Sequence, residues 1–296
     1  LLVAASCGGI MGSFVSEVNR RRAGSFYQAG SLAFSAIAVF SLVSLADRVT
    51  LPTLGWVLAA FIFLPALAAL ALPAESTPQP QALAATFARI GREFKITFLR
   101  WDAVPYTLLV TLPMCSGAMI GLRPSLAAVF GVSGTQVAWM NGLAGALLTA
   151  AGAVTASLIP VRISAPVAYL LSGLLNAATL AVLALGPLRP AVYFTGTVLF
   201  LFSIGICYAM FTAVALEFLG SSGKSGSSRY AIINSIGNLP VAYMAFLDGR
   251  SYAHWGPRAM PAADAVLGTI GATPLLAHFA ISRRRKMPRV LRQENA

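Results

Sequence analysis

The sequence has few charged residues and little of the polar surface that a water-soluble protein needs. Charged side chains make up only 10% of the 296 residues, whereas apolar side chains make up 57%. An average soluble domain carries roughly 25% charged residues, so this chain cannot cover a water-soluble globule. Its length would hold two soluble domains, but it also holds many bilayer spans of about 20 residues each. The composition therefore predicts a membrane protein.

Acidic residues, histidines and cysteines are also scarce. The chain has 21 Lys and Arg, but only 9 Asp and Glu, two His and three Cys. Cys7, Cys115 and Cys207 lie inside apolar runs, and neither they nor His254 and His278 show metal-ligand spacing, so no metal or other cofactor is expected. The net charge of +12 would suit nucleic acid binding if the basic residues shared one soluble face. Here they stand in short gaps between apolar runs, which is typical of membrane topology and excludes a nucleic acid partner.

Nine apolar runs near the length of a bilayer span follow one another along the chain. They are bounded by charged residues or Pro and lack the alternation of a barrel strand, so each is predicted to be a helix. The prediction is an all-α membrane protein, a polytopic helix bundle of about nine transmembrane helices. The runs are Leu1–Val15, Gly24–Ala46, Leu54–Leu72, Ala103–Leu122, Thr135–Ile159, Ser164–Leu185, Ala191–Ala215, Arg229–Leu247 and Ala262–Ile281.

Lys and Arg divide unequally between the alternating gaps. If the gap that holds Arg20, Arg21 and Arg22 is cytoplasmic, sixteen Lys and Arg fall in cytoplasmic gaps and five in outer ones. Cytoplasmic loops are enriched in Lys and Arg, so the C-terminus is predicted to be cytoplasmic. The expected location is a bacterial inner membrane. The odd number of spans, together with a first residue that is Leu and no signal peptide, favours a fragment that lacks about three upstream helices.

One long connection, from Pro73 to Asp102, separates three apolar runs from six. It contains three Pro residues and then a basic amphipathic stretch, Phe87 to Phe98. With three helices missing, the arrangement would be six plus six about a cytoplasmic linker. The predicted units are the last three helices of an N-terminal half (1–72), the linker (73–102), a C-terminal six-helix half (103–281) and a basic cytoplasmic tail (282–296).

Two stretches of sequence are similar to one transporter family. Six plus six helices about a cytoplasmic linker resembles the major facilitator superfamily. The stretch Arg20–Gly30, Arg-Arg-Arg-Ala-Gly-Ser-Phe-Tyr-Gln-Ala-Gly, resembles the segment that enters the fifth helix in the anhydromuropeptide permease and acetyl-CoA transporter branch. The stretch Ser228–Pro240, followed by Leu247-Asp248-Gly249, resembles the eleventh helix of that branch. The resemblance implies a secondary active transporter that moves a small or medium solute by alternating access, such as a muropeptide, a coenzyme A ester or a siderophore-like compound.

One loop departs from the pattern of the superfamily. Between its eighth and ninth helices the superfamily usually carries Gly, a small residue, Asp and Arg, which latch neighbouring helices together. The corresponding stretch keeps Gly152 and Arg162 but has Pro160 and no acid. The resemblance therefore predicts a degenerate latch at this loop.

Polar residues inside the apolar runs are the candidates for substrate binding. Secondary transporters bind substrate near the midplane, where helices are interrupted and polar groups converge. Pro113, followed by Cys-Ser-Gly at 115–117, predicts a kink that frees a carbonyl, either for function or for packing alone. Asn234 and Asn238 stand four residues apart, so both should face the bundle interior, as ligands or as interhelical hydrogen-bonding groups.

Four further residues are weaker candidates for the solute site. Arg123 stands at the outer end of the fourth run, as an electrostatic lure for an anionic solute or as an interfacial anchor. The others can bind substrate or hydrogen-bond a neighbouring helix, and they are Tyr208, Asn141 and Gln28.

Acidic residues are the candidates for coupling transport to an ion, because intramembrane charge usually marks a proton or ion relay. No ionisable residue is predicted deep in an apolar run. If protons drive transport, the coupling residue is predicted to be Glu17 or Glu217, although Glu17 also fits an interfacial partner of Arg20 or Arg21. The acids that stand within about a turn of a predicted helix end are Glu17, Asp102, Glu217, Asp248 and Asp264.

Two other classes of function fit a polytopic membrane chain. A membrane-embedded lipid-modifying enzyme would need acids, His or Cys gathered at one interface, and the sequence shows no such cluster, so no catalytic residue is predicted. A non-transporting receptor or pseudo-transporter would need no coupling residue. The expected partners are the lipid bilayer and a small-molecule solute, with the proton as the candidate coupling ion.

Overall fold

The computed structural model describes residues 2–45, 48–67, 83–219 and 226–293, and every regular element in these ranges is helical. The prediction of an all-α protein is therefore confirmed. The main helices are α1 (Leu2–Phe14), α2 (Arg20–Leu45), α3 (Leu51–Ala66), α4 (Leu83–Phe98), α5 (Val104–Thr111), α6 (Ala118–Leu122), α7 (Gly134–Asn141), α8 (Leu143–Ala156), α9 (Ala165–Leu185), α10 (Pro190–Leu219), α11 (Gly226–Ile236), α12 (Leu239–Trp255) and α13 (Ala259–Gln293). Short 3-10 segments precede α2 and α5, and another, Arg123–Phe130, follows α6.

Six helical stretches within the described residues are long and apolar enough to cross a membrane. The chain is therefore a polytopic integral membrane protein with about six candidate spans. Of the nine predicted runs, the first and third correspond to helices of only 13 and 16 residues, and the fourth is interrupted. The six stretches are Arg20–Leu42, Gly134–Ala156, Ala165–Leu185, Pro190–Leu219, Gly226–Trp255 and Ala259–Ser282.

Two predicted single helices are interrupted where the local sequence disfavours a helix. Helix α5 ends at Thr111, and the next residue, Leu112, is extended at ψ 156°, because the ring of Pro113 clashes with a helical backbone at the residue before it. Cys115 and Gly117 then take left-handed conformations, at φ 55° and φ 76°, before α6 begins. The eighth run breaks between α11 and α12, at Gly237 and Asn238. These interruptions expose backbone and polar groups inside the bundle.

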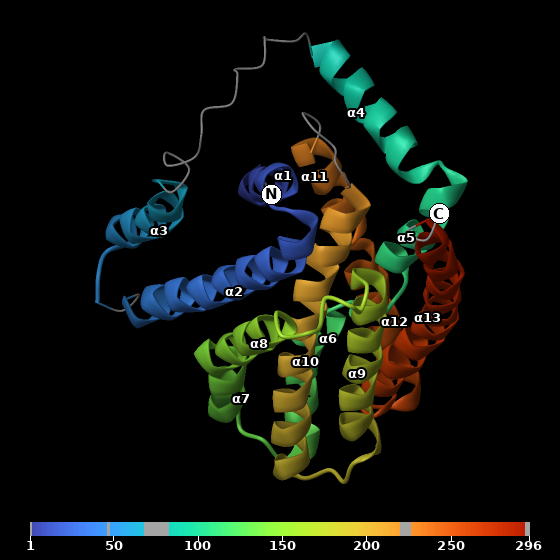
Figure 1. The fold of residues 1–296 in the computed structure, drawn as a ribbon. Coiled ribbons are helices and arrows are strands. Elements are labelled where there is room, and N and C mark those ends of the chain that lie inside the picture. Colours follow the sequence, from blue (N-terminus) through green and yellow to red (C-terminus); the bar gives the residue numbers. More distant parts are fainter. Residues whose placement is uncertain (1, 46–47, 68–82, 220–225, 294–296) are drawn as a thin grey trace.

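Helix α10 is the most buried of the six spans, and other helices of the bundle pack around it (Figure 1). It packs against α2, α8, α9 and α11. Its crossing with α8 brings the two backbones together, because a Cβ on Gly205 would lie 1.9 Å from the Thr149 carbonyl oxygen, and one on Gly152 would lie 2.0 Å from that of Phe202. Small residues at helix crossings permit this close approach in membranes.

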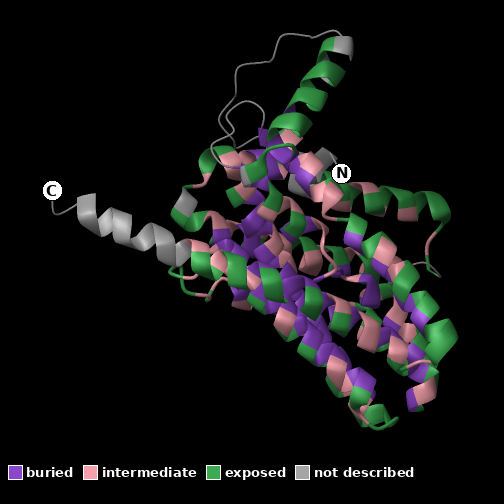
Figure 2. Cartoon of the chain, turned by 90° about the vertical axis from the view of Figure 1, so that its right-hand side faces the viewer, coloured by how far each residue is buried: buried purple, intermediate pink, exposed green. Residues whose placement is uncertain are grey.

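The buried residues gather along the interior of the bundle (Figure 2). Many large apolar side chains are exposed on its outside. Leu171 and Leu175 of α9 and Val198 and Leu199 of α10 are exposed examples. An apolar exterior on long apolar helices is suited to contact with lipid rather than water.

The predicted amphipathic stretch of the linker forms helix α4, which extends away from the bundle (Figure 1). Its Glu93 carboxylate accepts a charge-assisted hydrogen bond from the Arg229 guanidinium at the start of α11. This ion pair connects the linker to the segment that was predicted to be the C-terminal half. The division into two halves stays a prediction.

Candidate functional site

A cavity of about 230 Å³ lies where the two interruptions meet α2, α9 and α10. Because interrupted helices present backbone groups and polar side chains inside a bundle, this is where a solute could be held away from lipid. Four of the six predicted substrate-binding residues line it: Gln28, Tyr208, Asn234 and Asn238. We call it the central cavity; its other lining residues are Leu32, Met114, Cys115, Ser116, Tyr169, Cys207, Phe211, Gly237, Pro240 and Val241.

Asn234 and Asn238 contribute the two amide side chains on one wall of the central cavity. Asn234 is half-buried and Asn238 is exposed, and the Asn238 amide donates to the backbone carbonyl of Asn234 at 2.8 Å. Asn234 lies near the end of α11 and Asn238 lies in the break before α12, so their common orientation does not follow from spacing on one continuous helix. Both still line the same cavity, and their role in substrate binding stays a prediction.

The interruption between α5 and α6 forms another wall and is held by tyrosine hydroxyl groups. The Tyr243 hydroxyl donates to the Thr111 carbonyl at 2.7 Å, and the Tyr169 hydroxyl donates to the Met114 carbonyl at 3.3 Å. These bonds satisfy carbonyls that the helix break leaves without intrahelical partners. A buried and a half-buried tyrosine, Tyr169 and Tyr243, thus stabilise an irregular segment that the position of Pro113 only predicted as a kink.

Tyr208 and Gln28 reach the central cavity from α10 and α2. A Cβ added to Gly117 would lie 2.4 Å from the Tyr208 hydroxyl oxygen, so only glycine permits this approach, and its φ of 76° also favours glycine. The Gln28 amide donates to the Thr212 hydroxyl of α10 at 2.7 Å. Gln28 therefore contributes to the cavity and at the same time joins α2 to α10.

Arg123 and Asn141 lie outside the central cavity and contact each other. The Arg123 guanidinium donates to the Asn141 side-chain oxygen and stacks over the Phe200 ring at 5.6 Å. Arg123 is only 1% exposed, so it does not stand at an exposed helix end as either sequence interpretation assumed. The 3-10 segment that begins at Arg123 turns its side chain inward, which the charge pattern alone did not indicate.

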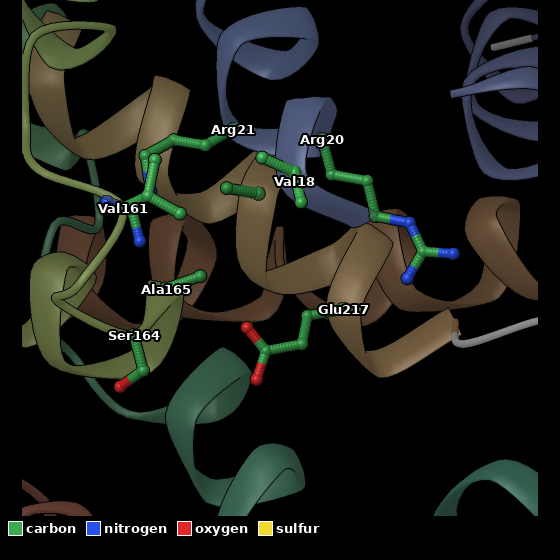
Figure 3. Close-up of a pocket in the computed structure, with 8 residues that line it drawn as sticks. Val18, Arg20, Arg21, Val161, Ser164, Ala165 and Glu217 are labelled. Atoms are coloured by element: carbon green, nitrogen blue, oxygen red, sulfur yellow. The ribbon is translucent and has the colours of Figure 1, made fainter. Parts of the chain in front are cut away.

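A second cavity, of about 340 Å³, lies at the start of α2 and the end of α10 (Figure 3). Glu217 lines it, is exposed, and accepts a hydrogen bond from the Tyr106 hydroxyl at 2.8 Å. Glu217 stands nine residues after Tyr208, which is about 14 Å along the helix, so it is remote from the central cavity. The side chain of Glu17, the other predicted coupling residue, lies outside the described part of the chain.

Arg21 closes one side of this second cavity by binding the loop between α8 and α9. Its guanidinium donates to the backbone carbonyls of Ile159, Pro160 and Ile163, the Pro160 bond being 2.8 Å long. Figure 3 shows Arg21 beside Val161 of that loop. This loop includes part of the stretch from Gly152 to Arg162 for which the sequence resemblance predicted a degenerate latch, and that role stays a prediction. Arg21 connects α2 to this loop through backbone carbonyls.

Replacing Arg21 with Ala is expected to loosen this loop. The change leaves three carbonyls without their donor, and each charged hydrogen bond contributes about 1.5–3 kcal/mol. A cysteine introduced as Ser164→Cys should react several-fold faster with a thiol reagent in the Arg21→Ala variant than in the protein that keeps Arg21. Arg22→Ala, which removes an exposed arginine next to it, is the matched control; equal rates in both variants would contradict the role of Arg21.

Two acids do not lie where the sequence placed them. Asp248 is in the middle of α12 and is 0% exposed, and Asp264 of α13 is 5% exposed. The prediction that no ionisable residue lies deep in an apolar run is therefore wrong for Asp248, whereas Asp264 lies within the first two turns of α13, where it is buried. Helix α12 continues to Trp255, beyond the predicted end at Leu247. The polar residues after Leu247 therefore lie within the helix and not in a loop. A buried stripe at helical spacing could have revealed this: Pro240, Met244, Asp248 and Ser251.

Within the described residues, no group of three or more His, Cys, Asp or Glu could hold a metal ion. No protein-family model matches the chain, and no curated protein matches it. The geometry and the sequence are therefore the basis for a functional assignment.

Proposed function

We propose that this chain is a secondary active transporter of the major facilitator type rather than an enzyme, and that it moves a small or medium solute by alternating access through the central cavity. The observation that supports this proposal most is the position of the cavity. It lies between α2, from the predicted N-terminal half, and the interrupted helices of the predicted C-terminal half. Transporters bind solute at such a boundary, next to discontinuous helices.

The residues of the central cavity favour an uncharged, polar part of a solute. Its described lining offers amide, hydroxyl and thiol groups and contains no Lys, Arg, Asp or Glu. Amides and hydroxyls bind sugar and peptide groups, whereas the phosphates of a coenzyme A ester would call for Lys or Arg. Among the implied substrate classes, the lining therefore supports a muropeptide best. The cavity is smaller than the roughly 300–1,000 Å³ of a typical ligand pocket, so it would hold one sugar or peptide portion at a time.

Uptake by the intact protein in proteoliposomes tests the proposal. Radiolabelled anhydromuropeptide, acetyl-CoA and a ferric siderophore are supplied separately, under an imposed proton gradient. We expect saturable uptake of the anhydromuropeptide and competition by unlabelled anhydromuropeptide. Uptake of acetyl-CoA alone would contradict the substrate class, and protein-independent leakage of all three would contradict transport.

The proposed orientation predicts that the linker and the C-terminal tail are both cytoplasmic, because the Lys and Arg distribution requires it. Single cysteines are introduced as Gln79→Cys and Gln293→Cys; Gln79 lies outside the described residues. Both should be protected from an impermeant thiol reagent in intact cells and react after permeabilisation. Labelling of either one from outside would reverse the orientation.

A further inference from the structure

Asp248 is a carboxylate without a partner in the interior of the bundle. Its side chain is 0% exposed, and neither carboxylate oxygen has a hydrogen-bond partner among the residues that the structure describes. It stands seven residues before the end of α12, which is about 10 Å along the helix. A buried, ionised carboxylate without a partner is strongly disfavoured, so such a group is stable when it holds a cation.

Asp264 supplies a second carboxylate from the adjacent helix. It is 5% exposed, and α13 packs against α12 after a connection of only three residues, so Asp264 and Asp248 lie at similar distances from the turn between the two helices. Its Oδ2 lies 3.5 Å from the Ser116 hydroxyl. Two like charges enclosed together repel each other, so one cation bound between them would relieve both the repulsion and the loss of hydration.

The groups that surround the two acids supply no competing positive charge within the described residues. Helix α13 contributes Asp264 itself, the segment before α6 contributes Cys115 and Ser116, and Tyr243 of α12 donates its proton to a backbone carbonyl. The nearest arginine along α12, Arg250, is exposed and stacks on the Phe246 ring at 5.8 Å. Arg258 donates to the carbonyl of Gly186.

Ser116 connects the two acids to the central cavity. It lines that cavity, and its hydroxyl contacts the Asp264 carboxylate. It belongs to the interruption between α5 and α6, whose irregular backbone can shift more readily than a regular helix. Binding of a cation at the acid pair can therefore affect the shape of the cavity wall through Ser116.

We propose that Asp248 and Asp264 form a binding site for one shared proton, and that Ser116 transmits its occupancy to the central cavity. On binding, one O–H bond forms on a carboxylate oxygen and no other covalent bond changes; on release, the proton returns to water. A proton suits the site better than a metal ion, which needs several oxygen ligands at short distance. The coupling role rests on the proposed transport function, but the existence of the site does not.

Modification by N,N′-dicyclohexylcarbodiimide tests the site in the purified intact protein without any solute. This apolar reagent adds to a protonated carboxylic acid and rearranges to a stable N-acylurea, whose mass identifies the residue. Labelling is measured at pH values from about 5 to about 9, with and without Na⁺. We expect labelling at Asp248 or Asp264 that decreases as the pH rises and does not respond to Na⁺. Exposed Glu217 in the same molecule is the internal control, with weak labelling.

Several outcomes would overturn the proposal. Protection by Na⁺ at constant pH would identify a sodium site instead, and labelling of Glu217 with none at either buried acid would exclude a proton site. In the variant Asp264→Asn, the extent of labelling at Asp248 should differ at least several-fold from that of the parent protein at one of the pH values. An unchanged profile would show that the two acids do not share a proton. If labelling behaves as expected but proteoliposomes take up no solute, the transport function fails and the proton site remains.

Discussion

Replacing both Asn234 and Asn238 with Ala is expected to reduce solute transport by an order of magnitude or more, while the protein reaches the membrane in normal amount. Both amides line the central cavity. A bound solute that loses its hydrogen-bonding partners leaves polar groups unpaired, which costs roughly 1–3 kcal/mol for each group. Uptake of radiolabelled anhydromuropeptide at low concentration measures the loss.

The same double variant separates a solute-binding role from a structural one. An interhelical polar contact in a membrane contributes on average only about 0.6 kcal/mol, so a purely structural pair should tolerate Ala with little loss of function or of folded protein. Asn176 of α9 provides the control, because its amide donates to the Ser203 hydroxyl of α10 at 2.8 Å and lies outside the central cavity. Asn176→Ala should transport nearly normally. Near-normal transport by the double variant would remove these residues from the site.

Gly205→Val is expected to prevent accumulation of the folded protein. A Cβ at this position would lie 1.9 Å from the Thr149 carbonyl oxygen and 3.0 Å from the Ala153 backbone nitrogen, both on α8. These atoms belong to a helix backbone and cannot rotate away, so α8 and α10 would have to separate. The separation would expose the most enclosed span of the bundle and remove its packing along the whole contact.

Monodispersity in mild detergent and the quantity of membrane-inserted protein measure this effect. Gly30→Ala is the matched control, because no atom lies within 4 Å of a Cβ placed there and Ala is favoured over Gly inside a helix. It should leave both quantities unchanged. A monodisperse Gly205→Val protein at parental yield would show that the α8–α10 crossing is not as close as described.

The sequence predicted an all-α membrane protein and the approximate positions of the six candidate spans, because hydropathy responds to lipid directly, but it overstated the number of spans. It also predicted the irregularity at Pro113, since proline disfavours a helix at the preceding residue. The break at Gly237 and Asn238 was not predicted, because the apolar run continues through both residues without proline until Pro240. Long apolar runs conceal such interruptions when no charge marks them.

Two other features could not be predicted because they depend on tertiary contacts. Arg21 binds backbone carbonyls of a distant loop, and backbone acceptors leave no signal in a sequence. Asp248 follows directly after the predicted apolar run Arg229–Leu247, although its side chain is buried inside the bundle. For the candidate site, residue type and position selected Asn234, Asn238, Tyr208 and Gln28, whereas only the packing of the bundle brought them to one cavity.

Accessibility of the central cavity from the two sides of the membrane tests alternating access most directly. Asn234→Cys is introduced into a chain whose three native cysteines are replaced by Ser, and an impermeant maleimide is applied to right-side-out and inside-out vesicles. The account predicts that the cysteine reacts from both sides, because the cavity opens to each in turn, and that anhydromuropeptide slows both reactions. Reaction from one side only, unaffected by anhydromuropeptide, would contradict it.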